Sequence, residues 1–402
     1  MADSDGVLYA STLRELRRLV DENGEPAAME CAGPREHIFF NPSQLSCGIV
    51  TCGGLCPGLN DVIRAIVLSL RHHYQVATIL GFRFGFEGLV ERYGHQPLTL
   101  TPDGVNRINE LGGSVLGSSR GHQNPAEMVD RLDRLGVGVL FVIGGDGSLR
   151  GAHAITREVA RRNLKIAVVA VPKTIDNDIS FVQKTFGFET AVSEARRATA
   201  AANAEAEGAR NGIGLVKLMG RDSGFIAAYS VLVDGQVNFC LVPEVRFTLG
   251  RLLAELCRRL RERGHAVVVV AEGAGQDLVE GREERDASGN IRHRDIGVFL
   301  RDAISRHFQE QGTPITLKYV DPSYAIRSVR ATAHDAAFCL LLGHNAVHAA
   351  MTGRTDMVVG FWNHQFVHVP IPLAVSRRKR IDPDGLLWNS VLASTGQPRD
   401  MC

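Results

Sequence analysis

Short apolar runs rich in β-branched residues alternate with amphipathic stretches along most of the chain. The apolar runs predict buried strands, and the stretches between them have the spacing of helices that cover a sheet. Strands are expected at 47–52, 76–81, 137–143, 165–171, 214–218, 239–242, 266–271, 316–320 and 357–361. Helices are expected at 60–71, 125–135, 151–162, 189–206, 223–232, 249–263, 295–309 and 333–351. This alternation predicts an α/β fold with mainly parallel sheets, and so many strands favour two Rossmann-like lobes over one oversized sheet.

Two segments depart from this pattern. The first 45 residues are polar and are interrupted by several glycines and prolines, so they predict an N-terminal extension outside the sheets. The segment 281–295 is charged and contains Ser288-Gly289-Asn290, which predicts an exposed turn or hairpin.

Composition narrows the class of protein. The 402 residues include 45 Lys and Arg against 44 Asp and Glu, a net charge of +1, which disfavours nucleic acid and anionic membranes as partners. No apolar run approaches the roughly 18 residues that span a bilayer, and the N-terminus lacks the order of a secretory signal. Eight cysteines are too few for a disulfide scaffold in a chain of this length. A soluble, cytoplasmic protein is therefore expected.

Glycine-rich or acidic loops follow several of the predicted strands, where parallel α/β sheets bind their ligands. The first reads GGLCPGLN (53–60), and its glycines let backbone N–H groups approach an anion. It lacks the Lys-Ser/Thr of a P-loop, and a plain strand-to-helix turn is the alternative. The second reads GGDGS (144–148), which combines close approach to phosphates with one carboxylate for a divalent cation, although an Asp-Gly turn has the same residues.

Two further loops carry charged side chains. PKTIDND (172–178) places Asp176 and Asp178 beside a lysine and a hydroxyl, which suits a general base with a supporting acid or metal-bound phosphate chemistry; an Asx-turn is the structural alternative. KLMGRDSG (217–224) places Arg221 where it can clamp a phosphate. Glu272, Lys318, Tyr324 and Arg327 follow later strands, and a surface ion pair would explain each of the charged ones equally well. Together these loops predict a cleft with phosphate clamps and a few acids.

Three other patterns could indicate a metal site, an iron–sulfur cluster or a nucleic-acid patch. Cys47, Cys52 and Cys56 have a spacing close to that of iron–sulfur ligands but off by one residue, so buried packing is favoured. His344 and His348 lie one helical turn apart without a third ligand, which favours an ordinary helix face. The run 377–380, RRKR, favours a solvated or anion-binding loop over a nucleic-acid patch.

An ordered set of motifs resembles the 6-phosphofructokinase family, in particular the ATP-dependent branch of plant and trypanosomal enzymes. The set comprises GGLCPGLN (53–60), LGSSRG (116–121), GGDGS (144–148), PKTIDND (172–178), KLMGRDSG (217–224), AEGAGQ (271–276) and YVDPSYAIRS (319–328). The resemblance runs from about residue 39 to the tail LWNSVLASTGQP (387–398). It implies transfer of a phosphoryl group from ATP to the 1-hydroxyl of fructose 6-phosphate, which gives fructose 1,6-bisphosphate in glycolysis.

The resemblance also implies a role for each matching residue. Asp176 is expected to be the base, with Asp178, Thr174 and Arg221 as the other catalytic residues, and Asp146 is expected at Mg²⁺. The residues expected to bind ATP are Gly54, Arg120, Gly145, Asp146, Gly147, Ser148 and Lys173. The residues expected to bind the sugar phosphate are Thr174, Ile175, Asp176, Met219, Gly220, Arg221, Glu272, Lys318, Tyr324 and Arg327.

Two positions bear on the phosphoryl donor. Pyrophosphate-dependent relatives carry Asp where this chain has Gly147, so Gly147 favours ATP, whereas Lys173 is shared with the pyrophosphate enzymes. The plant and trypanosomal ATP enzymes combine both residues, as this chain does. A pyrophosphate-dependent transferase and a catalytically silent regulatory homologue are the alternatives. One departure concerns Gly212, where bacterial enzymes have an arginine that reaches the 6-phosphate of a neighbouring subunit; Asn211 is a weak substitute.

The resemblance further implies a homotetramer, or at least a dimer, and allosteric control by effectors that the sequence leaves open. It implies lobes that exchange chain segments. The nucleotide-binding lobe is expected to comprise 46–187 plus 327–376, and the sugar-phosphate lobe 188–326 plus 377–402, with 1–45 as the N-terminal extension.

Overall fold

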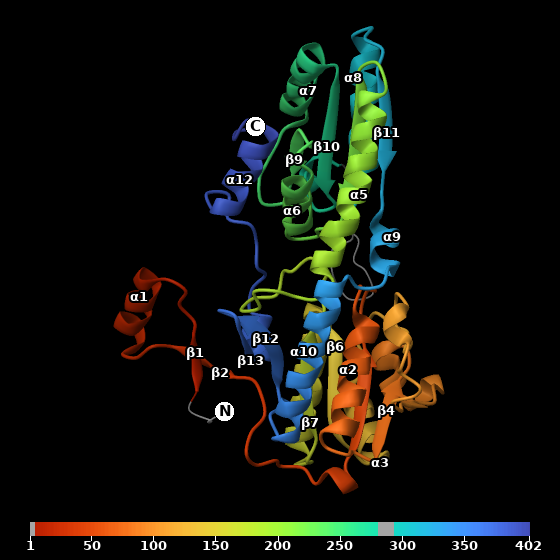
Figure 1. Ribbon diagram of the computed structural model, residues 1–402, viewed down its shortest axis with the longest axis vertical. Helices are drawn as coiled ribbons and strands as arrows, with labels where there is room; N and C mark the ends of the chain where they lie inside the picture. Colours follow the sequence, from red (N-terminus) through yellow and green to blue (C-terminus); the bar gives the residue numbers. More distant parts are fainter. Residues whose placement is uncertain (1–4, 280–292) are drawn as a thin grey trace. The chain divides into compact units, whose positions relative to one another are not determined.

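The structure is a computed structural model that describes residues 5–279 and 293–402. The chain forms two compact units, residues 1–187 with 328–378 and residues 188–327 with 379–402. The predicted turn or hairpin at 281–295 falls, except for its last three residues, outside the described residues. Each unit is an α/β structure built on its own sheet, so the predicted fold class is confirmed (Figure 1).

The first unit is built on a nine-stranded sheet. Its central strands β12, β7, β6, β3 and β4 are parallel, while β1, β2, β13 and β5 join by antiparallel pairing at the two edges. In spatial order the strands are β1 (Gly6–Leu8), β2 (Ala28–Cys31), β13 (Gln365–Pro370), β12 (Met357–Trp362), β7 (Ala167–Pro172), β6 (Val137–Gly144), β3 (Ser46–Thr51), β4 (Thr78–Phe82) and β5 (Leu98–Thr99).

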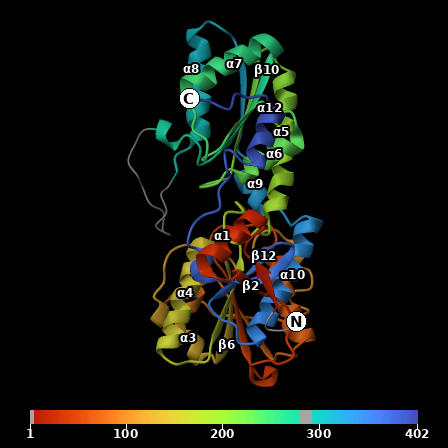
Figure 2. The same cartoon turned by 90° about the vertical axis from the view of Figure 1, so that its left-hand side faces the viewer.

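Helices cover both faces of this sheet. Two of them, α2 (Leu59–His72) and α10 (Ala333–Met351), pack on one face, where Ile49, Ile63 and Leu342 belong to one fully buried cluster. On the other face α3 (Pro125–Arg134) and α4 (Asp146–Arg161) bury a second cluster (Figure 2). The sheet is thus apolar on both sides, as expected for strands with a parallel, doubly covered arrangement. The unit also contains α1 (Leu13–Asn23) and α11 (Ile371–Ala374).

The second unit has a smaller, fully parallel sheet. Its strand order is β11 (Thr316–Val320), β8 (Gly212–Leu218), β10 (His265–Ala271) and β9 (Phe239–Leu241). Helices α5 (Phe188–Glu207), α6 (Phe225–Asp234) and α12 (Leu386–Thr395) lie on one side of this sheet, and α8 (Ile296–Glu310) lies on the other (Figure 2). Side chains of α7 (Leu249–Arg263) join those of α8 in one buried cluster. The short α9 (Ser323–Ser328) follows β11.

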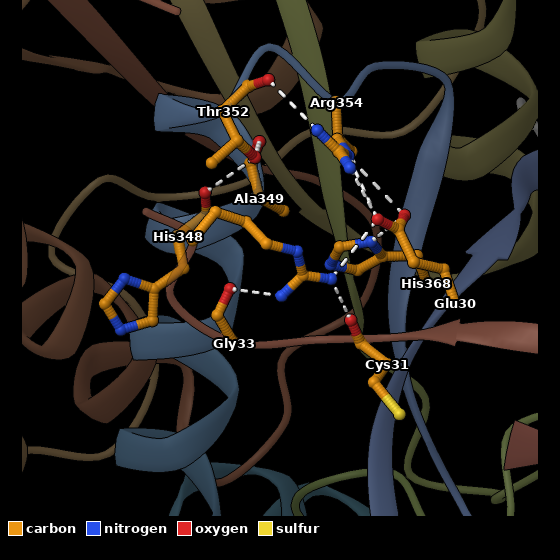
Figure 3. Close-up of polar contacts among 9 residues, drawn as sticks. Glu30, Cys31, Gly33, His348, Ala349, Thr352, Arg354 and His368 are labelled. Atoms are coloured by element: carbon orange, nitrogen blue, oxygen red, sulfur yellow. Dashed lines mark hydrogen bonds and ion pairs between the residues drawn. The ribbon is translucent and has the colours of Figure 1, made fainter. Parts of the chain in front are cut away.

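The prediction that the first 45 residues lie outside the sheets is wrong in part. Strands β1 and β2 extend the large sheet, because β2 pairs antiparallel with β13 and places Glu30 opposite His368. Glu30 accepts hydrogen bonds from Arg354 at 2.6 Å and from Arg35 at 3.2 Å, and its Oε2 lies 2.7 Å from Nδ1 of His368 (Figure 3). Burial tends to raise the pKa of Glu30, but the hydrogen bonds and charges of Arg354 and His368 outweigh it and lower the pKa to about 2. Tertiary ion pairs therefore hold a strand whose local sequence is a poor strand former.

Other features complete the fold. Within residues 5–279 and 293–402, 3₁₀ turns lie at Pro42–Gln44, Gly85–Leu89, Glu91–Tyr93, Ile108–Glu110 and Gln276–Leu278. Helix α4 begins at Asp146, five residues earlier than predicted, so the GGDGS motif forms its first turn rather than a loop. In the described part of the chain no helix is both long and apolar enough to cross a membrane.

Candidate active site

The first glycine loop lies between β3 and α2, and two cations lie beside it. Gly53 has a φ of 84°, a conformation that glycine adopts without strain. The ammonium of Lys173, which is only 7% exposed, donates to the Gly54 carbonyl at 2.7 Å. A Cβ added to Gly54 would lie 3.6 Å from Nη2 of Arg120. The loop is therefore narrow and flanked by positive charge, which suits phosphate oxygens.

The LGSSRG motif is bound to this loop. The hydroxyl of Ser118 donates to the Gly53 carbonyl at 2.5 Å, and the Gly53 N–H donates to the Ser119 carbonyl at 3.1 Å. These bonds bring Arg120 to the glycine loop although 65 residues separate Gly53 from Ser118.

The second glycine loop ends β6 and forms the first turn of α4. The unsatisfied N–H groups of this turn and the helix dipole favour an anion. Asp146 is held by Arg150 at 3.3 Å, and Nη2 of Arg378 lies 3.8 Å from the same carboxylate oxygen. A Cβ on Gly147 would meet no atom within 4 Å, so the space over this residue is open.

The loop 173–178 after β7 gathers the predicted catalytic groups of the first unit. The Thr174 hydroxyl donates to Oδ1 of Asp178 at 2.7 Å and accepts the Asp176 N–H at 3.3 Å. Nη1 of Arg378 donates to Oδ2 of Asp178 at 2.6 Å. Thr174, Asp176 and Asp178 therefore share one hydrogen-bonded turn, and Asp178 is engaged on both of its oxygens.

Asn177 and Thr185 fix the backbone of this turn. Asn177 has a left-handed φ of 54°, which an asparagine tolerates better than most residues. Its Oδ1 accepts the Thr185 N–H at 3.1 Å, and the Thr185 hydroxyl donates to the Thr174 carbonyl at 2.7 Å. The side chain of Thr185 is fully buried, so the turn is braced from inside the unit.

In the second unit, the loops after β8 and β10 lie against each other. The Glu272 N–H donates to the Leu218 carbonyl at 2.9 Å, and the Gly273 N–H donates to the Gly220 carbonyl at 3.0 Å. A Cβ on Gly273 would lie 1.9 Å from the Arg221 carbonyl oxygen, so only glycine permits this approach. These bonds join Met219, Gly220 and Arg221 to Glu272.

Three residues of β11 and α9 were predicted to bind the sugar phosphate, and the structure gives them different surroundings. Nε of Arg327 lies 3.0 Å from the sulfur of Met219, so Arg327 joins the β8 loop. Tyr324 is 81% exposed. Lys318 lies within β11, opposite Gly214, and its ammonium is 3.8 Å from Glu205 on α5. Lys318 is therefore not brought to Met219 and Arg327, and its contact with a sugar phosphate stays a prediction.

Lys217, which had no role in the prediction, connects the strand ends of this unit. Its ammonium lies 2.8 Å from Asp321 and 2.9 Å from Asp295, the residue that caps α8. Burial tends to lower the pKa of Lys217 and to raise the pKa of both carboxyls. The mutual hydrogen bonds and charges prevail, so the lysine pKa is raised and both carboxyl pKa values are lowered.

The residues present fit a Mg²⁺ ion that is bound together with a nucleotide. No group of three or more His, Cys, Asp or Glu side chains in the described residues could hold a metal by itself. Mg²⁺ is commonly held by one or two carboxylates and by the phosphates of its substrate. Asp146, at the open first turn of α4, supplies such a carboxylate.

In the described residues, the cysteine set, the histidine pair and the run 377–380 make contacts within the protein. Cys47, Cys52 and Cys56 are buried free thiols, and burial raises the pKa of Cys52 to about 12, so it is not poised as a thiolate ligand. His344 and His348 pack against His73, with ring centroids 5.8 and 6.2 Å away. Within the run RRKR, predicted to be a solvated or anion-binding loop, Arg378 forms ion pairs with Asp146 and Asp178.

Two parallel-sheet units whose strand-end loops carry glycines, cations and carboxylates define an α/β protein that handles phosphorylated ligands. The family model described as phosphofructokinase matches residues 46–350. A relative named ATP-dependent 6-phosphofructokinase, from Borreliella burgdorferi, is 50% identical over 387 residues, which cover 94% of this chain and 87% of the relative. A second relative of the same name, from Trypanosoma cruzi, is 47% identical over 369 residues, which cover 91% of this chain and 76% of the relative. The chain belongs to the phosphofructokinase family.

A solved structure agrees with this assignment at the level of the fold. The structure of a pyrophosphate-dependent phosphofructokinase from Marinobacter aquaeolei matches with a TM-score of 0.72 at 20% identity, over 87% of this chain and 91% of that one. At that identity the match concerns the fold and carries no information on the phosphoryl donor.

Proposed function

We propose that this protein transfers the γ-phosphoryl group of ATP to the 1-hydroxyl of fructose 6-phosphate and so forms fructose 1,6-bisphosphate. The observation that carries the proposal is the loop 173–178. It anchors a buried lysine on the first glycine loop and holds a threonine hydroxyl and two carboxylates in one turn. The names of the relatives, at about half identity over nearly the whole chain, support the same reaction.

The proposed roles rest on the family resemblance and on the chemistry of the side chains. Asp176 accepts the proton of the attacking hydroxyl, and the Thr174 hydroxyl binds the transferring phosphoryl group. Asp178 orients Thr174 through its 2.7 Å hydrogen bond. Arg221 of the second unit supplies positive charge for the transition state. Catalysis of this kind depends on positioning and charge neutralisation, because little covalent chemistry falls to the protein.

The nucleotide is assigned to the first unit. Gly54, Arg120, Gly145, Ser148 and Lys173 border its phosphates, and Asp146 holds Mg²⁺. That ion, when bound, neutralises charge on the phosphate oxygens. The open space over Gly147 leaves room for a nucleotide, whereas an aspartate there would bring negative charge toward the phosphates. ATP is therefore favoured over pyrophosphate as the donor.

The family resemblance assigns the sugar phosphate to loops of the second unit, and it also assigns substrate contacts to Thr174, Ile175 and Asp176. Met219, Gly220, Arg221 and Glu272 form one hydrogen-bonded group of loops that is suited to hold it. Arg327, beside Met219, is the best placed of the predicted cations for the 6-phosphate. Lys318 and Tyr324 are weaker candidates for that phosphate in view of their positions.

The state of the molecule in the cell is part of the proposal. A cytoplasmic homotetramer or dimer, open to allosteric control, is expected from the resemblance to the family. Light scattering on the purified protein measures the number of subunits. Fructose 6-phosphate saturation curves with and without AMP test one effector class, and a curve that AMP leaves unchanged would argue against control by AMP.

The experiment that tests the reaction is product identification. The purified protein is incubated with Mg²⁺, ATP and fructose 6-phosphate, and the mixture is followed by ³¹P NMR. We expect loss of the γ-phosphate signal and growth of a second sugar-phosphate signal from carbon 1. Absence of transfer under conditions where the protein is folded would favour the alternative of a catalytically silent homologue.

A further inference from the structure

The run RRKR at 377–380 places the guanidinium of Arg378 between Asp146 and Asp178 of the first unit. Arg378 is the last residue of that unit. Its backbone pairs with Ile179, which directly follows the loop 173–178, here called the catalytic turn. The neighbouring Arg377 lies over the ring of Phe181, 5.6 Å from its centroid, and Lys379 lies over the ring of Phe225. Adjacent cations of one short run therefore have different environments, and Arg378 is directed to the carboxylates.

The two carboxylates are held unequally. Nη1 of Arg378 donates to Asp178 at 2.6 Å, a short charge-assisted bond, whereas Nη2 is 3.8 Å from Asp146. The side chain of Asp178 is 5% exposed, and that of Asp146 is 27% exposed. The guanidinium thus compensates the buried carboxylate fully and the more accessible one only partly.

Arg150 holds Asp146 from the other side and ties the same segment to α4. It reaches Asp146 at 3.3 Å and donates from Nη2 to the Val375 carbonyl at 2.8 Å. The segment 375–378 is therefore fixed at two places: Arg150 binds it to the first turn of α4, and Arg378 binds it to the catalytic turn.

A cation this close to two carboxylates affects where a divalent ion binds. A carboxylate in a tight ion pair is a poor ligand, since Mg²⁺ must displace the guanidinium and leave its charge uncompensated. A carboxylate with a longer, more exposed contact is available. The short contact of Arg378 therefore disfavours Asp178 as a metal ligand, whereas Asp146, whose contacts with Arg150 and Arg378 are longer and more exposed, is the more accessible carboxylate.

We propose that Arg378 is a positioning residue that assigns the two carboxylates their separate tasks. It holds Asp178 on Thr174 for phosphoryl transfer and directs the divalent cation to Asp146. This inference rests on the proposed function for its effect on turnover, but its effect on cation binding does not depend on catalysis.

The test compares Arg378→Gln, Arg378→Lys and the control Arg377→Gln, whose arginine lies over the ring of Phe181. Mn²⁺ binding to the protein in the presence of a saturating, non-hydrolysable ATP analogue is measured by electron paramagnetic resonance. Loss of a unit charge about 4 Å from the carboxylates should tighten Mn²⁺ binding roughly tenfold in Arg378→Gln. Arg378→Lys keeps the charge and should bind Mn²⁺ like the wild type, as should Arg377→Gln.

A double variant separates charge from fold. Asp178→Asn added to Arg378→Gln removes the carboxylate that the first change uncovered, so Mn²⁺ affinity should return toward that of the wild type. If Arg378→Gln does not fold, Arg378→Lys still decides the positioning role. It keeps the charge but loses the two-pronged geometry, so kcat should fall roughly tenfold while KM for both substrates stays within about threefold.

Two results would overturn the proposal: unchanged Mn²⁺ affinity in a folded Arg378→Gln, and wild-type kcat in Arg378→Lys. Failure of the proposed function gives a different result. In that case the wild-type protein transfers no phosphoryl group to fructose 6-phosphate, while the Mn²⁺ titrations still report on Arg378.

Discussion

At the scale of single residues, the catalytic turn assigns different environments to two similar acids. Asp178 has both oxygens engaged, by Thr174 and by Arg378. Asp176 lies two residues earlier, and its backbone N–H donates to the same threonine. A carboxylate with both oxygens already hydrogen-bonded has no oxygen directed to a substrate hydroxyl. The arrangement therefore supports Asp176, rather than Asp178, as the proton acceptor.

Asp176→Ser removes this base without removing the turn. We expect kcat to fall by two or more orders of magnitude, with little change in KM for fructose 6-phosphate, since general-base catalysis typically contributes roughly 10²–10⁴-fold. Steady-state kinetics measure the effect. Asp133→Ser, at an exposed position on α3, is the control and should behave as the wild type. Activity that survives Asp176→Ser would show that the base has been misassigned.

His348 on α10 makes stability depend on pH. Burial, followed by the charges of His73, His344 and Arg35, lowers its pKa to about 4, and the Tyr74 hydroxyl lies 2.7 Å from its Nδ1. A histidine with a depressed pKa takes up protons more readily when unfolded, so stability should decrease as the pH falls from about 6.5 toward 4. His348→Gln should reduce the dependence of Tm on pH within this window.

Thermal unfolding between pH 7.5 and 4.5 measures the difference. His72→Gln, an exposed histidine on α2, is the matched control and should keep the wild-type slope. A slope that is equal in all three proteins would mean that His348 does not contribute.

At the scale of secondary-structure elements, the sequence predicts what is locally encoded and misses what tertiary contacts impose. The buried parallel strands follow from their continuous apolar runs, and the helices predicted at 60–71 and 249–263 follow from apolar periodicity. Strand β13 was not predicted, although Asn363 and His364, both with positive φ, mark a two-residue hairpin turn between β12 and β13. Asparagine was a signal for that turn. Strand β2 carried no comparable signal, because its stability depends on Arg35, Arg354 and His368.

The residues of the candidate site also fall into those that the sequence predicts and those that only tertiary contacts reveal. Glycine loops and the turn 173–178 are recognisable because their residue types are unusual at the ends of strands. Lys217 and Arg378 were missed as site residues, because a lysine or arginine in the sequence gives no indication of the carboxylate that it will meet. Their roles come from Asp321, 104 residues after Lys217, and from Asp178, 200 residues before Arg378.

Glu30→Gln tests whether ion pairs hold the N-terminal strands on the sheet. The substitution leaves Arg354 and the buried His368 without their carboxylate, which should lower the free energy of unfolding by about 1–3 kcal/mol. Guanidinium denaturation measures this change, and limited proteolysis should show earlier cleavage before β3. Glu22→Gln, in an exposed pair on α1, is the control. Unaltered stability of Glu30→Gln would mean that the backbone pairing of β2 with β13 suffices.

At the scale of the whole molecule, the fold explains how the chain is divided between its units and how its charges are distributed. The chain passes between its units three times, at 187/188, 327/328 and 378/379, and the last crossing directly follows Arg378. The net charge of +1 conceals local order. Lys173 lies on the first glycine loop, while Asp178 is paired with Arg378. A nearly neutral protein can thus present positive charge to phosphorylated ligands.

The central claim is phosphoryl transfer from ATP to fructose 6-phosphate, and the choice of donor tests it most directly. One preparation of the purified protein is assayed for fructose 1,6-bisphosphate with Mg²⁺ and fructose 6-phosphate, once with ATP and once with pyrophosphate, over a range of donor concentrations. The open space over Gly147 predicts a higher kcat/KM with ATP. A higher kcat/KM with pyrophosphate would contradict the account.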